Sequence, residues 1–263
     1  MCQDMMRAEI WLQETLDSQQ GIEELATRMG YSSSQIRRRF RKRFGVSPGT
    51  YRDQLRLEKA ARLLIHTPQN ISHIAAVCGY RNHSAFSRAF QRYYGDSPRH
   101  YRQRLRLTLQ KQCSDSTTFS YQIRELPRRQ AVLTRLYHPQ PLENLQGWQH
   151  HTWGAEDLPS ALNQASPLAV FHDQLIAGGL PRLDLGVAVD DTTSHLALPP
   201  TFRLQNLPAR RLACITLDST RQVDSAVLDM ACRSLAGSGA PLNGEAPQLL
   251  QEHGVLELRI PLL

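Results

Sequence analysis

Long apolar runs, Cys-x-x-Cys motifs and Gly-rich phosphate-binding loops are all missing from this chain of 263 residues. No run of about 18 apolar residues occurs, so the sequence predicts no membrane-spanning helix and no membrane partner. The first residues lack the basic and then apolar pattern of a secretory signal, which makes the cytoplasm the expected compartment. The length and a hydrophobic content of 41% suit two domains, each with its own core.

The cysteine content is low and the spacing is irregular. Five cysteines are present and no Cys-x-x-Cys occurs, so neither a zinc site nor a disulfide framework is indicated. His150 and His151 have no Asp, Glu or Cys at metal-ligand spacing, and we interpret them as a polar loop or the start of a helix. A Gly-rich phosphate loop, a Gly-x-Ser-x-Gly and a paired-carboxylate pattern are also lacking. The sequence therefore predicts no metal, no cofactor, no catalytic residue and no enzyme.

The positive charge is confined to the first part of the chain. Residues 1–112 hold 20 Lys and Arg against 9 Asp and Glu, whereas residues 113–263 hold 11 against 15. The net charge of +7 therefore divides into +11 and −4. A basic domain is typical of a polyanion partner such as nucleic acid, although a solvated basic surface would give the same composition.

Two similar segments follow each other in the basic part. Each begins with a short apolar helix face at spacing 0, 3, 4, 7 and then has a Gly-Tyr pair, at 30–31 and at 79–80. Glycine there can take the left-handed conformation that closes a helix. Ser33 in the first repeat and Asn82 in the second suit the N-cap of the next helix. The apolar faces are Ile22, Leu25, Ala26 and Met29, and Ile71, Ile74, Ala75 and Cys78.

The second helix of each repeat is expected at about 33–44 and 82–94. Ile36, Phe40 and Phe44 face inward in the first repeat, and Phe86 and Phe90 in the second. The outward residues of the two helices are offset by fifty positions. They are Ser34, Arg37, Arg38 and Arg41, and Ser84, Ser87, Arg88 and Gln91.

This pattern predicts a duplicated helix-turn-helix, in which the second helix of each pair enters a major groove of double-stranded DNA. Arginine can bond guanine or phosphate there, and serine and glutamine suit base edges or phosphates. The alternative is a helical bundle with polar surface helices. A connecting helix at 48–66 would be about 28 Å long, close to the 34 Å turn of B-DNA. One chain, expected to be a monomer, would then read two boxes about ten base pairs apart.

These residues resemble the AraC/XylS family of transcription regulators over residues 5–107. The resemblance rests on the two Gly-Tyr turns, on the run from Phe86 to Phe90, and on the Gly-x-Ser-Pro segments at 45–48 and 95–98. It implies RNA polymerase as a further partner and leaves activation or repression open. It implies base contacts by Ser34, Arg37, Arg38, His83, Ser84, Ser87 and Arg88, and phosphate contacts by Arg41, Lys42, Gln91 and Arg92.

The remainder of the chain has a mixed pattern. Polar residues 108–118 are expected to be a linker. Strands are expected at 119–126, 130–137, 168–173, 183–190, 212–217 and 255–261, and helices within 143–165 and at 220–236. A turn at 178–181 is expected to join the strands at 168–173 and 183–190. The segments 124–129 and 205–210, 81 positions apart, both contain Leu-Pro and end in Arg. An α+β domain at 119–263 is therefore predicted, built from two strand-strand-helix-strand-strand halves with a ligand groove between them.

Residues 119–263 resemble the GyrI-like effector-binding domain, and the order of the two domains resembles the Rob-like arrangement. The resemblance implies a small apolar or cationic effector. Leucines at 249 and 250 stand where an acidic and aromatic pair is expected, so either Glu252 replaces the acid or the preference for cations is lost. The candidate ligand residues are Tyr137, Trp148, Trp153, Phe171, Glu252 and Glu257.

The sequence therefore predicts a DNA-binding transcription regulator that responds to a small molecule. Two other roles for the second domain stay open, a hydrolase of small electrophiles and a protein-interaction module. Turnover of a ligand would favour the first, and a shallow polar groove would favour the second.

Overall fold

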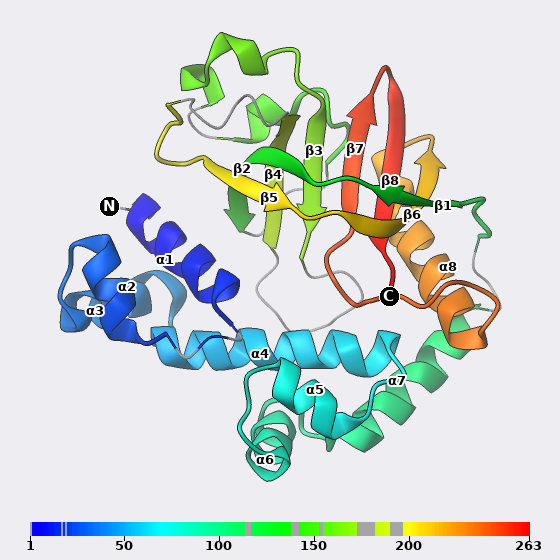
Figure 1. The fold of residues 1–263 in the computed structure, drawn as a ribbon, viewed down its shortest axis with the longest axis horizontal. Helices are drawn as coiled ribbons and strands as arrows, with labels where there is room; N and C mark the ends of the chain where they lie inside the picture. The colour runs from blue at the N-terminus through cyan, green and yellow to red at the C-terminus, as the bar shows by residue number, and fades with distance from the viewer. Residues whose placement is uncertain are drawn as a thin grey trace. The chain divides into compact units, whose positions relative to one another are not determined.

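The computed structural model describes residues 2–16, 18, 20–113, 117–137, 142–152, 155–172, 182–189 and 197–263. The chain divides into two compact units, residues 1–105 and residues 106–263 (Figure 1). None of the described helices combines the length and apolar character needed to cross a membrane. Within the described ranges, no group of three or more His, Cys, Asp or Glu side chains could hold a metal ion.

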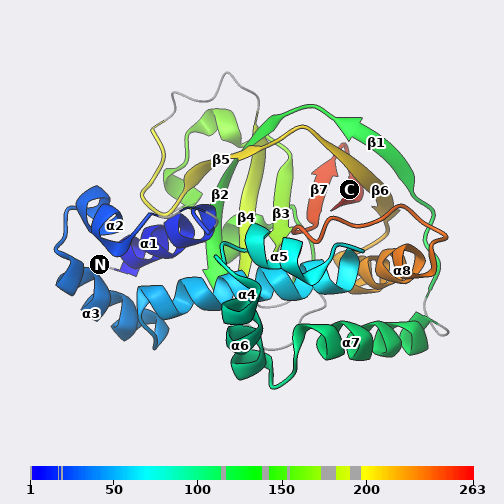
Figure 2. The ribbon, with the colours of Figure 1, turned by 60° about the horizontal axis from the view of Figure 1, so that its bottom comes forward.

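The secondary structure described in unit 1 is helical. Its helices are α1 Cys2–Glu14, α2 Ile22–Met29, α3 Ser33–Phe44, α4 Pro48–His66, α5 Ile71–Val77, α6 His83–Tyr94 and the first part of α7 Pro98–Gln112. The connecting helix α4 has the predicted bounds, because Ser47 caps it and Pro48 occupies its first turn. Figure 2 shows α2 and α3 near the start of α4, and α5 and α6 farther along it.

The predicted linker is partly wrong. Residues 108–112 continue α7, which crosses the boundary between the two units. Leu109 is buried at this end of the helix, which favours helix over an exposed connection. Residues 114–116 lie outside the described part of the chain.

Unit 2 holds an antiparallel sheet of eight strands in the order β1-β6-β8-β7-β3-β4-β2-β5. If β1 to β4 exchange names with β5 to β8, the result is the same strand order read from the other edge of the sheet. The two halves are therefore related by a pseudo-twofold axis. The first strand of each half therefore pairs with a strand of the other half: β1 pairs with β6, and β5 pairs with β2. The strands are β1 Gln122–Leu126, β2 Arg129–Tyr137, β3 Pro167–Phe171, β4 Arg182–Val189, β5 Arg203–Leu207, β6 Arg210–Leu217, β7 Gln248–Glu252 and β8 Val255–Pro261.

The internal repeat of unit 2 extends beyond the Leu-Pro segments. Strands β1, β2 and β3 begin at one constant offset before β5, β6 and β7, the same offset that separates the two Leu-Pro segments. The paired starts are Gln122 and Arg203, Arg129 and Arg210, and Pro167 and Gln248. The predicted strand ends at 173 and 190 and the predicted turn at 178–181 lie outside the described residues.

The halves differ between their second and third strands. The second half has helix α8 Val223–Ala236, close to its expected place. The helix expected within 143–165 is wrong, because the described residues there form 3-10 turns at Trp148–His151, Ala155–Asp157 and Ser160–Leu162. Gly147 and Thr152 interrupt this segment and are poor helix formers, whereas α8 is rich in Ala, Leu and Met.

One face of the sheet forms the main core of unit 2. Leu256, Leu258 and Ile260 of β8 pack there with Val227 and Met230 of α8. Alternate residues of a strand point to opposite faces, so Glu257 and Arg259 lie on the other face. We call the first the helix-covered face and the second the opposite face.

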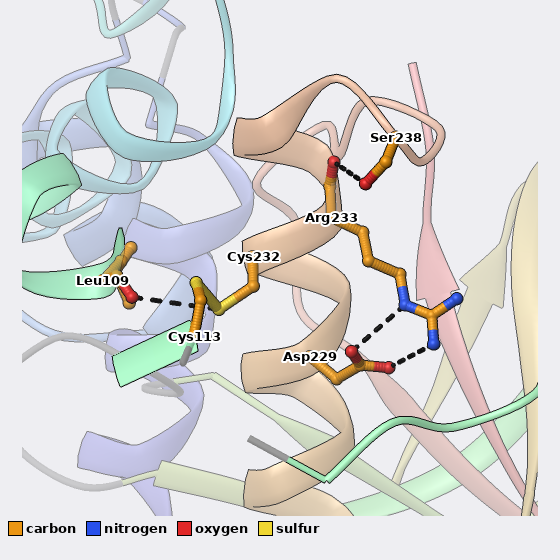
Figure 3. Close-up of a disulfide and its surroundings, with 6 residues drawn as sticks. All are labelled: Leu109, Cys113, Asp229, Cys232, Arg233 and Ser238. Carbon is orange, nitrogen blue, oxygen red and sulfur yellow. Dashed lines mark hydrogen bonds and ion pairs between the residues drawn. A yellow bond between two sulfur atoms is a disulfide. The ribbon is translucent and has the colours of Figure 1, made fainter. Parts of the chain in front are cut away.

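The expectation of no disulfide framework is wrong at one pair of residues. Cys113 at the end of α7 and Cys232 of α8 form a disulfide across 119 residues of sequence (Figure 3). No spacing motif marks a pair so distant, and the fold alone brings the two residues together. Among the described cysteines, Cys78 and Cys214 are free and buried.

Candidate nucleic-acid interface and effector face

Local capping fixes where the second helix of each repeat begins. The N-cap of α3 is Ser32 and not Ser33: the Gln35 amide N–H donates to Ser32 Oγ, and Gln35 Oε1 accepts from the Ser32 N–H at 2.9 Å. Asn82 caps α6 as predicted, since its Oδ1 accepts from the Ala85 N–H at 2.8 Å. Gly45 and Gly95 end the two helices in the left-handed conformation. With these caps, α3 and α6 have equal lengths and occupy equivalent places in the two repeats.

Three aromatic rings pack together at the buried face of each of these helices. Phe40 and Phe90 are fully buried at equivalent positions. Phe40 lies 4.5 Å from Phe44 and 5.4 Å from Tyr51, measured between ring centroids. In the second repeat the rings are those of Phe90, Tyr94 and Tyr101, with Phe90 at 4.6 Å and 5.1 Å from the other two. The helices are therefore fixed by the same contacts in both repeats, which leaves their other faces free for binding.

Two equivalent arginines that sequence reasoning missed hold the segments before each repeat. Arg102 donates to the Leu64 carbonyl at 3.0 Å and to the Gln69 carbonyl at 2.6 Å. Arg52, at the equivalent position of the first repeat, donates to the carbonyl of Gln20, which precedes the first repeat as Gln69 precedes the second. Their matched offset was visible in the sequence, but their carbonyl partners belong to other elements and depend on the fold.

The predicted DNA-binding side chains lie together on the outer faces of α3 and α6. All are exposed except Ser87, which is half-buried. Arg37 lies 3.6 Å from Glu23, but both side chains are more than half exposed, so solvent screens the pair. The exposed set is Ser34, Arg37, Arg38, Arg41 and Lys42 on α3, and His83, Ser84, Arg88, Gln91 and Arg92 on α6.

The two outer faces differ in charge. Helix α3 has the sequence SSQIRRRFRKRF with six basic residues, whereas α6 has HSAFSRAFQRYY with two. One of the six, Arg39, stacks on the Tyr31 ring at 4.4 Å, which directs it toward the preceding turn. The face of α3 therefore suits an array of phosphates and guanines, and that of α6 suits fewer, more varied hydrogen bonds.

The candidate effector residues do not gather at one place. Trp148 is 2% exposed in the core of the helix-covered face, beside the Phe202 ring. Phe171 packs against the same core. Tyr137 lies at the end of β2, on the opposite face and half-buried. Trp153 lies outside the described residues.

Glu252 and Glu257 lie on the opposite face, where arginines already pair with them. Glu252 lies 3.4 Å from Arg129 and 3.9 Å from Arg259. Glu257 lies 2.6 Å from Arg259 and also binds Arg124 on the exchanged strand β1. Because each carboxylate has a cationic partner, a cationic ligand would have to displace an arginine.

An equivalent cluster lies in the other half, around Asp184 of β4. Asp184 is fully buried and accepts two bonds from Arg135, at 2.7 and 2.8 Å. Arg203 of the exchanged strand β5 and His172 reach the same carboxylate at 2.6 and 2.7 Å. Burial alone would raise the pKa of Asp184, but Arg135, His172 and Arg203 hold that pKa well below its ordinary value. Asp184 is therefore an ionised buried group that ties β5 into the first half.

A cavity lies on the opposite face between the two halves. The repeated Leu-Pro segments line it symmetrically, together with Arg129 and Arg210, which occupy equivalent positions at the starts of β2 and β6. Its volume is about 20 Å³, room for about one water molecule. Small-molecule sites are usually several hundred Å³, so this cavity by itself is too small for such a ligand.

Known proteins resemble the first unit. Residues 25–104 match the family described as a helix-turn-helix domain. The HTH-type transcriptional activator RhaS of Escherichia fergusonii is 35% identical over 77 residues, which are 29% of this chain and 28% of RhaS. The HTH-type transcriptional regulator GbdR of Pseudomonas aeruginosa is 36% identical over 77 residues, 29% of this chain and 20% of GbdR. The chain thus spans less than a third of either relative's length.

Solved structures are also similar in this region. The DNA-binding domain of AdpA, in complex with a target DNA, is 32% identical, with a TM-score of 0.38 over 40% of this chain and 94% of that chain. The match of residues 25–104 covers the described helices α3 to α6, with their duplicated caps and ring contacts. Residues 25–104 therefore form a helix-turn-helix domain.

Proposed function

We propose that the chain is a sequence-specific DNA-binding transcription regulator, in which α3 and α6 of one chain enter two adjacent major grooves. The observation that carries the proposal is the duplication itself: two helices with the same ring contacts behind them and exposed polar faces in front. The connecting helix has 19 residues and a length of about 28 Å, close to one turn of B-DNA. A monomer on an asymmetric site therefore fits better than a symmetric dimer on a palindrome.

The roles assigned to the side chains follow from their place along each helix. Residues in the first turns reach base edges, and residues nearer the end reach the backbone. The proposed base contacts are Ser34, Arg37, Arg38, His83, Ser84, Ser87 and Arg88. The proposed phosphate contacts are Arg41, Lys42, Gln91 and Arg92. RNA polymerase is the further protein partner that this role implies, since the relative RhaS is a transcriptional activator.

The test compares Arg88→Ala with Lys42→Ala on a duplex selected from a random library. Loss of a base contact by Arg88→Ala should weaken specific binding by about 1–3 kcal/mol and relax the preference at one base. Loss of a phosphate contact by Lys42→Ala should weaken all duplexes alike and reduce the salt slope by about one. If Arg88→Ala leaves affinity and preference intact, the assignment of α6 as a reading helix is wrong.

For unit 2 we propose a sensor role, with a small apolar effector held on the opposite face. The apolar choice rests on the pairing of Glu252 and Glu257 with arginines, which weakens the case for a cation. Binding would require the 20 Å³ cavity to widen. The likeness of residues 119–263 to the GyrI-like domain stays a prediction.

The small cavity favours a second candidate, a protein-interaction module without a ligand. Hydrogen exchange of the full chain against apolar and cationic compounds separates the two. A ligand that binds only the folded form slows exchange in unit 2 by mass action. Protection by an apolar compound supports the sensor, protection by cations alone contradicts the apolar choice, and protection by none favours the module.

A further inference from the structure

One turn of α8 holds the chain after α7 at two points. The first is the disulfide between Cys113 and Cys232, whose Cα atoms lie 5.6 Å apart. The second is Phe119: its N–H donates to Asp229 at 3.0 Å, and its carbonyl accepts from Arg233 at 2.7 Å. Asp229 and Arg233 also pair with each other, as Figure 3 shows. The non-covalent clamp at Phe119 therefore does not depend on the disulfide.

We propose that Cys113 and Cys232 form a reversible thiol–disulfide exchange site. Its oxidised form fixes the last turn of α7 to α8, and its reduced form releases that turn. The reaction partner is a low-molecular-weight thiol or disulfide, such as glutathione.

The consequence of reduction follows from the distance along the chain between the two fixed points. Cys113 and Phe119 are six residues apart, and six residues reach at most about 20 Å. In the oxidised form a disulfide joins the end of α7 directly to α8. Without it, the next point after α7 at which the chain is bonded to α8 is the clamp at Phe119. In the reduced form the two are joined by a chain segment that can extend up to about 20 Å.

This change concerns the whole of unit 1, because α7 belongs to both units. Its first turns are fixed in unit 1 through the Tyr101 ring beside Phe90 and through the bonds of Arg102. The buried Leu109 would still hold the end of α7, and the Cys232 sulfur lies 3.9 Å from the Leu109 carbonyl oxygen. In the reduced form this thiol can donate a weak hydrogen bond there, so release is partial and reversible.

The two sulfurs differ in access, which sets the order of the reaction. Cys113 is half-buried and Cys232 is 6% exposed, so an external thiolate attacks the Cys113 sulfur. The protein disulfide breaks, Cys232 leaves as a thiolate and takes a proton from water, and a mixed disulfide remains on Cys113. A second thiol displaces Cys113 from it. Two external thiols are thereby oxidised to one disulfide, the protein disulfide is reduced to two thiols, and the reverse steps restore it.

The two free buried cysteines, Cys78 and Cys214, do not compete for the oxidant. Cys78 is fully buried, and burial raises the pKa of its thiol to about 11. Burial also raises the pKa of Cys214. Since the thiolate is the reactive form, both are poor nucleophiles near neutral pH. Cys113 is thus more accessible than Cys78, Cys214 and Cys232.

The first test follows the site without DNA. The full chain is equilibrated at different ratios of oxidised to reduced glutathione, quenched in acid, unfolded and alkylated. Of the five cysteines, five should react in the reduced chain and three in the oxidised chain. Cys113→Ser and Cys232→Ser should abolish this change, whereas the control Cys214→Ala should keep it. No intramolecular bond at any ratio would overturn the proposal.

The second measurement reports on α7 through tryptic cleavage at the exposed Lys111. Cleavage should be slower by about tenfold or more in the oxidised chain than in the reduced one. Cys113→Ser should be cleaved rapidly with and without dithiothreitol. Equal cleavage of the oxidised and reduced wild type would show that the bond does not fix α7, and would overturn the proposal.

The regulatory consequence rests on the proposed function and is measured separately. The duplex is one selected with Cys113→Ser, and its affinity should change about fivefold or more between the oxidised and reduced wild type. Cys113→Ser should show no change. Redox-dependent cleavage with constant affinity would overturn the regulatory role alone. If no form binds DNA, the proposed function fails, and alkylation and cleavage still decide the thiol–disulfide site.

Discussion

Truncation of Phe90 to alanine should loosen α6 without loosening the equivalent helix of the first repeat. Phe90 is fully buried, with ring centroids of Tyr94 and Tyr101 at 4.6 and 5.1 Å. An aromatic side chain buries about 150–250 Å², which at about 25 cal/mol per Å² corresponds to about 4–6 kcal/mol. Measured costs of Phe→Ala in cores are about 3–5 kcal/mol, and we expect this range for the local stability of α6.

Hydrogen exchange read by mass spectrometry suits this prediction, because it reports on each helix separately in a chain of two units. A loss of about 3–5 kcal/mol corresponds to exchange in α6 about a hundred- to a few thousandfold faster. Gln91→Ala, an exposed change on the next residue of the same helix, should alter exchange by no more than about 0.5 kcal/mol.

The comparison within the same protein decides whether the two repeats have separate support. The core around α3 contains Phe40 but not Phe90, so exchange in α3 should change much less than in α6. A change of less than about tenfold in α6 would contradict the role given to the ring contacts. An equal loss in α3 and α6 would contradict the view that each reading helix has its own support.

Two further predictions concern a turn and a buried histidine. Gly79 and Gly30 both have positive φ, +80° and +70°, but a Cβ at Gly79 would meet Arg56 and the Leu16 carbonyl at 3.0 Å, whereas Gly30 has open space. Gly79→Ala should therefore lower the urea midpoint of unit 1 more than Gly30→Ala, and equal effects would contradict the close approach. Burial lowers the pKa of His172 below its ordinary 6.5, so the unfolded chain binds a proton that the folded chain excludes. The free energy of unfolding of unit 2 should therefore fall as the pH drops below 6.5, by at most about 1.4 kcal/mol per pH unit. Urea unfolding at several pH values should show a smaller slope for His172→Gln than for the wild type. An unchanged slope would contradict the role given to His172.

The helices of unit 1 could be predicted because residues close in sequence to each helix end set its boundaries. Glycine at each helix end, Ser-Pro before α4 and Asn82 before α6 act within a few residues of sequence. The one error in the caps arose in a run of three serines. Gln35 decides among them, since it lies three residues after Ser32 and completes a capping box there.

In unit 2 the internal repeat was visible in the sequence, but the burial of individual side chains was not. On β8, Glu257 alternates with Leu256 and Leu258 and therefore lies on the opposite face from these core leucines. Trp148 and Phe171 pack at the core of the helix-covered face, which the sequence does not reveal, because aromatic residues line pockets and fill cores alike. Only the strand register shows which face they occupy.

Contacts between distant residues escaped sequence analysis for a similar reason. The two cysteines of the disulfide are 119 residues apart and carry no motif. One arginine partner of Glu257 and one of Asp184 come from exchanged edge strands, Arg124 from β1 and Arg203 from β5. Strand exchange between the halves is a property of the topology, and the composition of the strands does not reveal it.

The most direct test of the central account is a hydroxyl-radical footprint of one chain on a duplex selected from a random library. If α3 and α6 enter adjacent major grooves, two protected patches should appear about ten base pairs apart on one face of the DNA. Insertion of about half a turn, roughly five base pairs, between them should abolish specific binding. A single protected patch, or a palindromic footprint that needs two chains, would contradict the account.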